Sequence, residues 1–279
     1  MSIIGHVAVI SRYPVKSMGG EDLLATNLGP LGIANDRLWA LRDIDTGKIL
    51  SAKLPSVGRK LLTWSASLDD NNKPTITIDG VKFSSDTAAA VAVFEAQAGE
   101  ALGRRVRLVT AGTADEVYES FWPEIDGLAM SAVSIDLPIA MSTTKGTFVD
   151  LAALHMVTTA SVAYLATLAP QSTININRFR PSIVIDAGQA SDGFVENDWV
   201  ERRAKLGAAT LQFGSLSPRC VMTTLAQTGL DDDPRVLQTI ASHNRHDFAG
   251  FGNFACLGIY AEVIEPGPVA VGDALELLS

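Results

Sequence analysis

Residues 61–78 read LLTWSASLDDNNKPTITI and carry the clearest strand signals of the chain. Two segments with alternating side chains, 61–68 and 75–78, flank a run of Asp, Asn, Lys and Pro at 69–74. Residues of these types tolerate the backbone conformations of turns, and alternation is typical of a half-buried strand. The stretch therefore predicts two antiparallel strands joined by a hairpin loop.

Further short strands are predicted on both sides of this hairpin. They cover residues 6–12, 38–43, 105–109, 182–186, 206–213, 256–264 and 270–278. The sequence EPGP at 265–268 is typical of a turn and separates the last two of these strands.

Three helices are predicted between the strands. Residues 87–102 are rich in Ala, with Asp86 in front as an N-cap candidate and Gly103 behind as a stop signal. The other two helices are predicted at 158–168 and at 234–243, where Pro234 stands in the first turn.

This pattern predicts a mainly β chain with a few helices, an α+β protein built from two packed β-barrel-like units. A length of 279 residues gives room for two modest domains. The segment 112–136 is rich in Gly and Asp and has no strong period, so we place the domain boundary there. The predicted domains are residues 1–120 and 121–279.

Composition and charge exclude several classes of protein. A content of 47% hydrophobic and 19% charged residues is that of a globular chain and excludes disorder as the main state. The net charge of −9 disfavours nucleic acid as a partner, unless the basic residues gather at one site. No apolar run approaches the roughly 20 residues that span a bilayer, and residues 1–13 do not resemble a secretory signal. We therefore expect a cytoplasmic protein with no membrane partner.

The segment Asn177-Arg178-Phe179-Arg180-Pro181 is the most informative local cluster. Pro181 biases Arg180 toward an extended backbone, and alternation then places both guanidinium groups on one face. Such a pair matches the oxygens of a phosphate and would form an anion clamp. In the alternative interpretation, which the local sequence alone favours, both arginines pair with surface carboxylates at a strand end.

Cys220 follows Pro218 and Arg219, and a neighbouring cation favours the thiolate that binds soft metals or attacks electrophiles. The alternative is a small buried hydrophobic residue, a description that fits Cys256 well. Two cysteines cannot form a disulfide framework or supply the four thiolates of an iron–sulfur cluster. The four histidines show no zinc pattern, and the common nucleotide and hydrolase motifs are absent from the sequence.

Six short pieces, taken in order, resemble the MOSC family, named for the C-terminal domain of molybdenum cofactor sulfurases. The pieces are YPVKS at 13–17, DRLW at 36–39, NRFRP at 177–181, DW at 198–199, RC at 219–220 and VGD at 271–273. The first part of the chain looks like the N-terminal β-barrel domain that accompanies MOSC domains, and the rest like the MOSC domain. This arrangement is similar to the mitochondrial amidoxime-reducing component and its bacterial relatives.

The resemblance implies a molybdenum cofactor of the molybdopterin type. Cys220 matches the thiolate that holds the metal, and basic residues would hold the phosphate of the pterin. The residues that match cofactor contacts are Lys16, Ser17, Arg37, Asn177, Arg178, Arg180 and Arg219, with Thr158 and Ser161 at a helix start that is also an N-cap candidate. Ser182 stands where the family often has Asn, so a polar contact there is missing or replaced.

The resemblance further implies an oxidoreductase that reduces N-hydroxylated small molecules. Because the chain lacks the cysteines for its own iron–sulfur cluster, we expect electrons from a separate protein of the ferredoxin or flavin reductase type. One alternative is a sulfur carrier, in which Cys220 accepts a persulfide from a cysteine desulfurase for metal-sulfur centre biosynthesis. Another is a protein that only binds or stores the cofactor. The sequence does not name the substrate, because loops such as 111–140 carry no motif.

Overall fold

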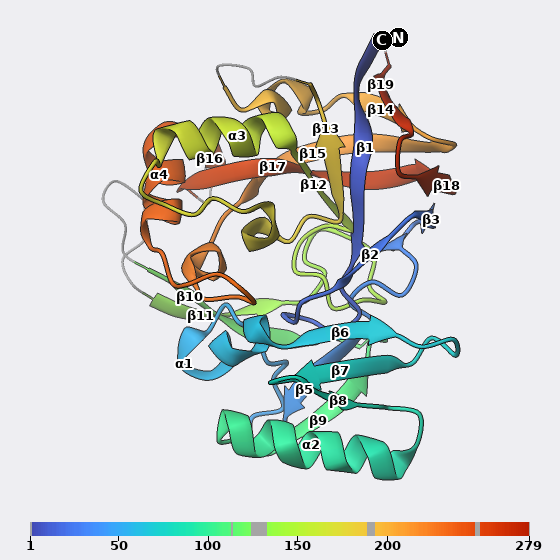
Figure 1. Cartoon of the computed structure of the whole chain (residues 1–279), viewed down its shortest axis with the longest axis vertical. Helices are drawn as coiled ribbons and strands as arrows, with labels where there is room; N and C mark the ends of the chain where they lie inside the picture. Colours follow the sequence, from blue (N-terminus) through green and yellow to red (C-terminus); the bar gives the residue numbers. More distant parts are fainter. Residues whose placement is uncertain (1, 113, 124–132, 189–192, 249–251, 279) are drawn as a thin grey trace.

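The computed structural model describes residues 2–112, 114–123, 133–188, 193–248 and 252–278. A closed β-barrel with two helices beside it forms the upper half of Figure 1, and smaller sheets with one long helix form the lower half. We refer to residues 13–110, which supply most of the lower half, as the N-terminal part. The two chain ends lie side by side at the top of the barrel (Figure 1).

Among the described residues, seven strands close the barrel. In spatial order they are β12 (Leu154–Thr158), β13 (Ile183–Asp186), β1 (Ser2–Arg12), β19 (Ala274–Leu277), β14 (Arg203–Leu206), β15 (Ala209–Pro218) and β17 (Gly252–Glu265). Pairing of β12 with β17 completes the ring, and only β12 and β13 among these pairs run parallel. Inward-pointing side chains such as Ile10, Leu211 and Ile259 fill the core. The first strand of the chain thus completes a barrel whose other strands come from its second half.

Two short strands and several helices cover the barrel. β2 (Glu21–Leu23) pairs with β1, and β16 (Arg245–Phe248) pairs with β17. The helical elements are α3 (Thr159–Leu168), η2 (Ile176–Phe179), η3 (Val195–Trp199), η4 (Val221–Thr224) and α4 (Arg235–His243). Val236, Leu237 and Ile240 of α4 pack with Leu165 of α3 in a second apolar cluster.

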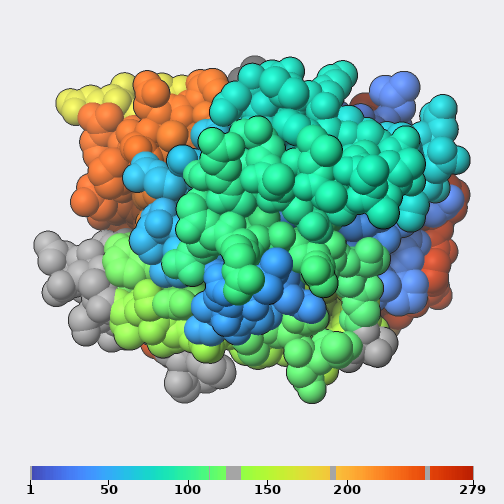
Figure 2. Space-filling view, turned by 90° about the horizontal axis from the view of Figure 1, so that it is seen from below, coloured from blue at the N-terminus to red at the C-terminus, as the bar shows by residue number. Residues whose placement is uncertain are grey.

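The N-terminal part is built from small antiparallel sheets around its own core. β5 (Trp39–Asp43) pairs with β9 (Val106–Thr110), and β6 (Ser65–Leu68), β7 (Pro74–Ile78) and β8 (Val81–Phe83) form a second sheet. The long helix α2 (Ala88–Leu102) buries Phe94 and Ala98 against these sheets. Seen from below, residues of this part occupy the centre and right of the visible face (Figure 2).

The remaining elements connect the two halves. β3 (Ala25–Gly29) pairs with β4 (Gly32–Ile33) and with β18 (Gly267–Ala270), and β10 (Val117–Trp122) pairs with β11 (Val133–Pro138). α1 (Pro55–Gly58) and the 3-10 helix η1 (Arg59–Thr63) precede β6. In the described part of the chain, no helix is long and apolar enough to cross a bilayer.

The predicted fold class is confirmed, and so is the central hairpin, in which Ser65 opposes Thr77 and Leu68 opposes Pro74. Its first strand is shorter than predicted, because residues 59–63 form η1. The helix over 87–102 is also confirmed, but Thr87 caps it instead of Asp86: the Thr87 hydroxyl accepts a hydrogen bond from the Ala90 N–H at 3.1 Å.

Two predicted strands are wrong in their extent, because each contains a glycine with a positive φ. Gly207 (φ 55°) turns the chain between β14 and β15, so residues 206–213 are not one strand. Gly272 (φ 93°) does the same between β18 and β19. The predicted turn at 265–268 is largely strand, since β17 ends at Glu265 and β18 begins at Gly267.

The segment 112–136, predicted as an irregular boundary, contains β10 and residues 133–136 of β11. Residues 113 and 124–132 lie outside the described residues. The boundary at residue 120 stays a prediction.

Candidate functional site

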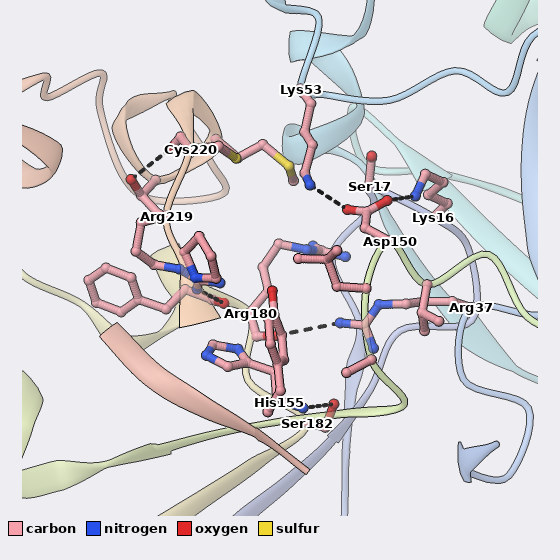
Figure 3. A pocket seen from close by; sticks show the side chains of 18 of the residues that line it. Lys16, Ser17, Arg37, Lys53, Asp150, His155, Arg180, Ser182, Arg219 and Cys220 are labelled. Atoms are coloured by element: carbon pink, nitrogen blue, oxygen red, sulfur yellow. Dashed lines mark hydrogen bonds and ion pairs between the residues drawn. The ribbon is translucent and has the colours of Figure 1, made fainter. Parts of the chain in front are cut away.

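A pocket lies between the barrel and the N-terminal part, and side chains from both point into it (Figure 3). The structure brings together seven of the residues predicted for the site: Lys16, Ser17, Arg37, Arg178, Arg180, Arg219 and Cys220. The pocket is also lined by residues that were not predicted for the site: Lys53, Asp150, His155, Ser182 and Tyr260. Six of the described lining residues are Lys or Arg, although the whole chain carries a net charge of −9.

Cys220 enters the pocket directly after β15, at the start of η4. The N–H of the preceding Arg219 donates to Ala255 O at 2.7 Å, and the Thr223 hydroxyl donates to Cys220 O at 3.0 Å. These bonds hold the backbone on both sides of the thiol. Cys256 lies elsewhere, fully buried in the barrel core, where desolvation raises the pKa of its thiol to about 12.

Tyr13 lies under two guanidinium groups of the pocket. The central guanidinium carbons of Arg37 and Arg180 lie 4.8 and 4.3 Å from the centroid of its ring. The Tyr13 hydroxyl donates to Pro181 O at 3.1 Å, and Arg37 pairs with the buried Asp36. Tyr13 thus fixes two cations side by side, and Asp36 compensates only one of them.

Arg180 is the less compensated of these two cations. Its Nη2 is buried with no hydrogen-bond partner among the described residues. Desolvation lowers the pKa of Arg180 to about 10, although Tyr13 favours its charged form. A buried donor with no partner is costly, so this atom is suited to an acceptor supplied by a ligand.

The geometry predicted for the two arginines is wrong. Arg180 adopts a left-handed backbone (φ 51°, ψ 51°) after the 3-10 turn of η2, so the chain turns here and does not extend. The Arg178 guanidinium points into a cage of backbone carbonyls, those of Thr173, Thr223, Leu225 and Asp231, at 3.1, 3.5, 3.4 and 2.8 Å. The alternative interpretation, in which the arginines pair with surface carboxylates, is also wrong for Arg178. This side chain is buried and binds backbone carbonyls.

Arg219 also brings a donor with no partner into the pocket. Its Nη1 donates to Phe179 O at 3.1 Å and its Nη2 donates to the Ser217 hydroxyl. Its Nε is buried and has no partner in the part of the chain that the structure describes. Arg180 and Arg219 therefore offer two unused donors to a bound anion.

Lys16 and Lys53 share the carboxylate of Asp150, and we call these three residues the lysine pair with its carboxylate (Figure 3). Lys53 Nζ lies 2.9 Å from Asp150 Oδ2, and Lys16 binds Oδ1. Desolvation lowers the pKa of Lys16 to about 8 in spite of Asp150. Burial acts on Lys53 too, but attraction to Asp150 and to other acidic groups nearby outweighs it and raises its pKa well above the usual value.

Ser17 positions the segment that carries Lys53, since the Ala52 N–H donates to the Ser17 hydroxyl at 3.0 Å. Its hydroxyl hydrogen is not used by this bond and can be donated to a ligand. Lys53 and Asp150 stand far apart in the sequence, and no local motif marks either of them.

His155 lies at the bottom of the pocket as Figure 3 shows it, on β12. Desolvation and the nearby Arg219 hold the pKa of its imidazole well below the usual value, so the ring is neutral. Its Nε2 lies 3.3 Å from Leu257 O, next to Gly258. Gly258 has φ 81°, and an added Cβ there would lie 2.6 Å from His155 Nε2. This position of β17 therefore requires a residue without a side chain.

Thr158, Ser161 and Asn177 are not among the described residues that line the pocket, and their contact with the cofactor stays a prediction. The Thr158 hydroxyl caps α3 by accepting from Ser161 N–H at 3.0 Å, and the Ser161 hydroxyl donates to the buried Glu196. Capping was the alternative for Thr158. Asn177 lies in η2, where its N–H donates to Asn175 Oδ1 at 2.9 Å.

The residues present fit an anionic cofactor that carries its own metal ligands. The described residues contain no group of three or more His, Cys, Asp or Glu side chains that could hold a metal ion. Such a cofactor would supply the remaining ligands of a metal bound at Cys220. The unused donors of Arg180 and Arg219 suit the phosphate of such a cofactor.

Family models match most of the chain. The model described as the MOSC N-terminal beta barrel domain matches residues 4–107, and the model described as the MOSC domain matches residues 143–276. The chain belongs to the MOSC family and carries both domains.

Solved structures resemble the chain more distantly, and no curated protein matches it. The similar structures include YiiM from Escherichia coli (17% identity, TM-score 0.32) and YiiM from Geobacillus stearothermophilus (14%, TM-score 0.30). Another, described as a hypothetical protein, has 20% identity and a TM-score of 0.32. Each match covers 46% of this chain and only 52–55% of the solved chain, and no conclusion follows from likeness at these TM-scores.

Proposed function

We propose that the protein binds a molybdenum cofactor of the molybdopterin type and reduces N-hydroxylated compounds. The observation that carries this proposal is the position of Cys220 in a pocket that gathers six cationic side chains. An acidic protein that concentrates cations around one thiol has a site for an anionic group that also needs a soft ligand. We place the protein in the cytoplasm, as its two unpaired cysteines suggest.

The residues of the chain divide into those that would bind the cofactor and those that position them. Cys220 would ligate the metal, and Arg37, Arg180 and Arg219 would donate hydrogen bonds to the phosphate. Arg178 positions η2 through its carbonyl contacts and does not need to touch the cofactor. When bound, the cofactor supplies the redox chemistry of the reaction.

The net reaction converts the N-hydroxylated substrate to the corresponding N–H compound and water, with two electrons and two protons consumed. We expect the electrons from a separate protein of the ferredoxin or flavin reductase type, because the two cysteines, Cys220 and Cys256, cannot build a cluster.

Turnover of cofactor-loaded protein tests the proposed activity. We expect the native chain and Cys256→Ala to reduce a hydroxylamine with a chemically reduced dye as donor, and Cys220→Ser to lose the activity. Cys256 is the matched control because its thiol is buried in the core, away from the pocket. Protein that is fully loaded with cofactor but reduces no hydroxylamine or amidoxime would contradict the activity and leave cofactor binding or storage.

A second candidate function, a sulfur carrier, is favoured by the cation next to Cys220. The Lys53 ammonium lines the same pocket as Cys220 and would stabilise the anion of a persulfide there. A cysteine desulfurase would be the partner in this case. Mass spectrometry of protein incubated with such an enzyme tests it: a gain of one sulfur atom on Cys220, absent in Cys220→Ser, supports the carrier, and an unmodified Cys220 contradicts it.

A further inference from the structure

Lys16, which the resemblance places at the cofactor, has its ammonium group occupied by the protein. Its Nζ donates to Phe148 O at 2.9 Å and to Asp150, and it lies 4.7 Å from the centroid of the Tyr118 ring. The side chain of Lys16 is only 5% exposed. An ammonium has three N–H donors, and here two are bound while the group lies against an aromatic face. Lys16 therefore has little left to offer to a ligand.

Lys53 makes contacts of the same kind but is held less tightly, because its Nζ lies farther from the Tyr118 ring, 5.3 Å from the centroid, and one of its two hydrogen bonds is long. Its Nζ donates to Asp150 Oδ2 at 2.9 Å and, more weakly, to the Tyr118 hydroxyl at 3.4 Å. These contacts leave its third donor without a partner among the described residues, and its side chain is 13% exposed at the pocket wall. Of the lysine pair, Lys53 is the member that can contact a ligand.

The charges of the lysine pair with its carboxylate do not balance. Two ammonium groups share the one carboxylate of Asp150, so this corner carries one excess positive charge. Removing an uncompensated charge from water is costly, and an anionic group of a ligand would offset the cost.

Lys53 also lies on the side of the pocket where Cys220 enters. In Figure 3 its ammonium points into the space between Cys220 and Asp150, whereas Arg37 comes from the opposite side. An anion bound by Lys53 would thus share the pocket with the thiol of Cys220.

We propose that Lys53 binds a negatively charged oxygen group of the substrate beside Cys220, so that the protein prefers N-hydroxylated compounds that carry a carboxylate. Asp150 is the positioning residue, because it holds the ammonium of Lys53 in place. The identity of the substrate in this inference rests on the proposed function. The presence of an anion site at Lys53 does not.

Calorimetric titration of the purified protein with benzoate and with neutral benzamide tests the anion site directly. We expect Lys53→Met to weaken benzoate binding by about tenfold or more, the loss of one charge-assisted hydrogen bond, and to leave benzamide binding unchanged. Lys53→Arg should retain most of the benzoate affinity. Lys60→Met is the matched control, because Lys60 is exposed and donates to Ala101 O at 2.7 Å, outside the pocket lining. Equal benzoate affinity in the native protein and in a folded Lys53→Met variant would overturn the proposal.

Turnover and cofactor content then distinguish the source of the anion. With a carboxylate-bearing hydroxylamine and its neutral methyl ester, we expect Lys53→Met to raise the ratio of KM for the acid to KM for the ester about tenfold, and Lys60→Met to leave this ratio as in the native protein. A fall in bound pterin in Lys53→Met would instead show that Lys53 holds the cofactor, and would overturn the assignment to substrate. Benzoate binding that depends on Lys53, in protein that reduces no N-hydroxylated compound, supports the anion site and contradicts the proposed function alone.

Discussion

Arg178 and Arg180 lie two residues apart, yet their guanidinium groups meet different surroundings. Arg178 is enclosed by four backbone carbonyls, whereas Arg180 leaves a buried Nη2 unused. The local sequence could not separate them, because the left-handed backbone at Arg180 follows from the 3-10 turn before it. The predicted clamp with both guanidinium groups on one face is therefore wrong, although both residues line the same pocket.

We predict that replacing each of these arginines by Met changes the free energy of unfolding by very different amounts. Arg178→Met leaves carbonyls without donors and should lower the free energy of unfolding by about 3 kcal/mol. Arg180→Met removes an uncompensated cation and should change this free energy by less than about 1 kcal/mol, while cofactor content falls. Urea titrations of both cofactor-free variants check the difference. A loss of stability in Arg180→Met as large as that in Arg178→Met would contradict the assigned roles.

Lys53 and Asp150 show why part of the site could not be predicted at the level of residues. The lysine precedes α1 and the aspartate lies shortly before β12, so only the folded chain brings them within 2.9 Å of each other. Cys220, by contrast, has a local signal in the neighbouring Arg219 and Pro218. The sequence thus predicts a site residue when its neighbour in the chain is chemically unusual. It does not predict a site residue whose partner is brought close only by folding.

At the level of elements, the start of α3 combines a cap with a buried carboxyl group. Glu196 accepts hydrogen bonds from Thr158 N–H at 2.5 Å and from the Ser161 hydroxyl, and it is fully buried. Desolvation raises its pKa above the usual 4.5 in spite of these bonds. Between 4.5 and the raised value, the folded chain keeps a proton that the unfolded chain has released, so the free energy of unfolding falls as the pH rises through this window.

We predict that Glu196→Gln removes this pH dependence. Relative to the variant, the native protein should lose stability as the pH rises above 4.5, which urea titrations at several pH values would measure. Glu100→Gln on the exposed side of α2 is the control and should follow the native profile. A difference between native protein and Glu196→Gln that stays constant with pH would contradict the prediction.

Caps and turns explain which elements the sequence predicts well. α2 ends at Gly103 in the left-handed conformation, and α3 begins at Thr158, both as the sequence indicates. The sequence predicts Gly207 and Gly272 as strand residues, because a single glycine in an alternating run does not distinguish a short turn from a continuous strand. Whether such a glycine lies in a strand or in a turn depends on which strands pair on either side of it, and only the folded chain determines that pairing.

At the scale of the whole molecule, β1 makes the two domains interdependent. The MOSC domain match begins at residue 143, but β1 lies between β13 and β19 and pairs with both. We therefore predict that residues 143–279 alone do not fold cooperatively, since two barrel edges are left unpaired. Far-UV circular dichroism and denaturant unfolding would measure this.

A rearranged chain supplies the control for this prediction. Ser2 pairs with Leu277, and the two chain ends lie side by side in Figure 1, so residues 1–12 can be attached after residue 279 through a short glycine linker. The rearranged chain should regain cooperative unfolding. Cooperative unfolding of the bare fragment 143–279 would show that β1 is dispensable for the barrel.

The central claim is that Cys220 and the cations around it hold a molybdenum cofactor. The most direct test expresses the chain in a host that makes molybdopterin and measures molybdenum and released pterin per chain, for the native protein, Cys220→Ser and Cys256→Ala. We predict about one molybdenum per chain in the native protein and in Cys256→Ala, and none in Cys220→Ser, as expected for a single thiolate ligand. Folded native protein that contains neither metal nor pterin, or a Cys220→Ser variant that retains its molybdenum, would contradict the account.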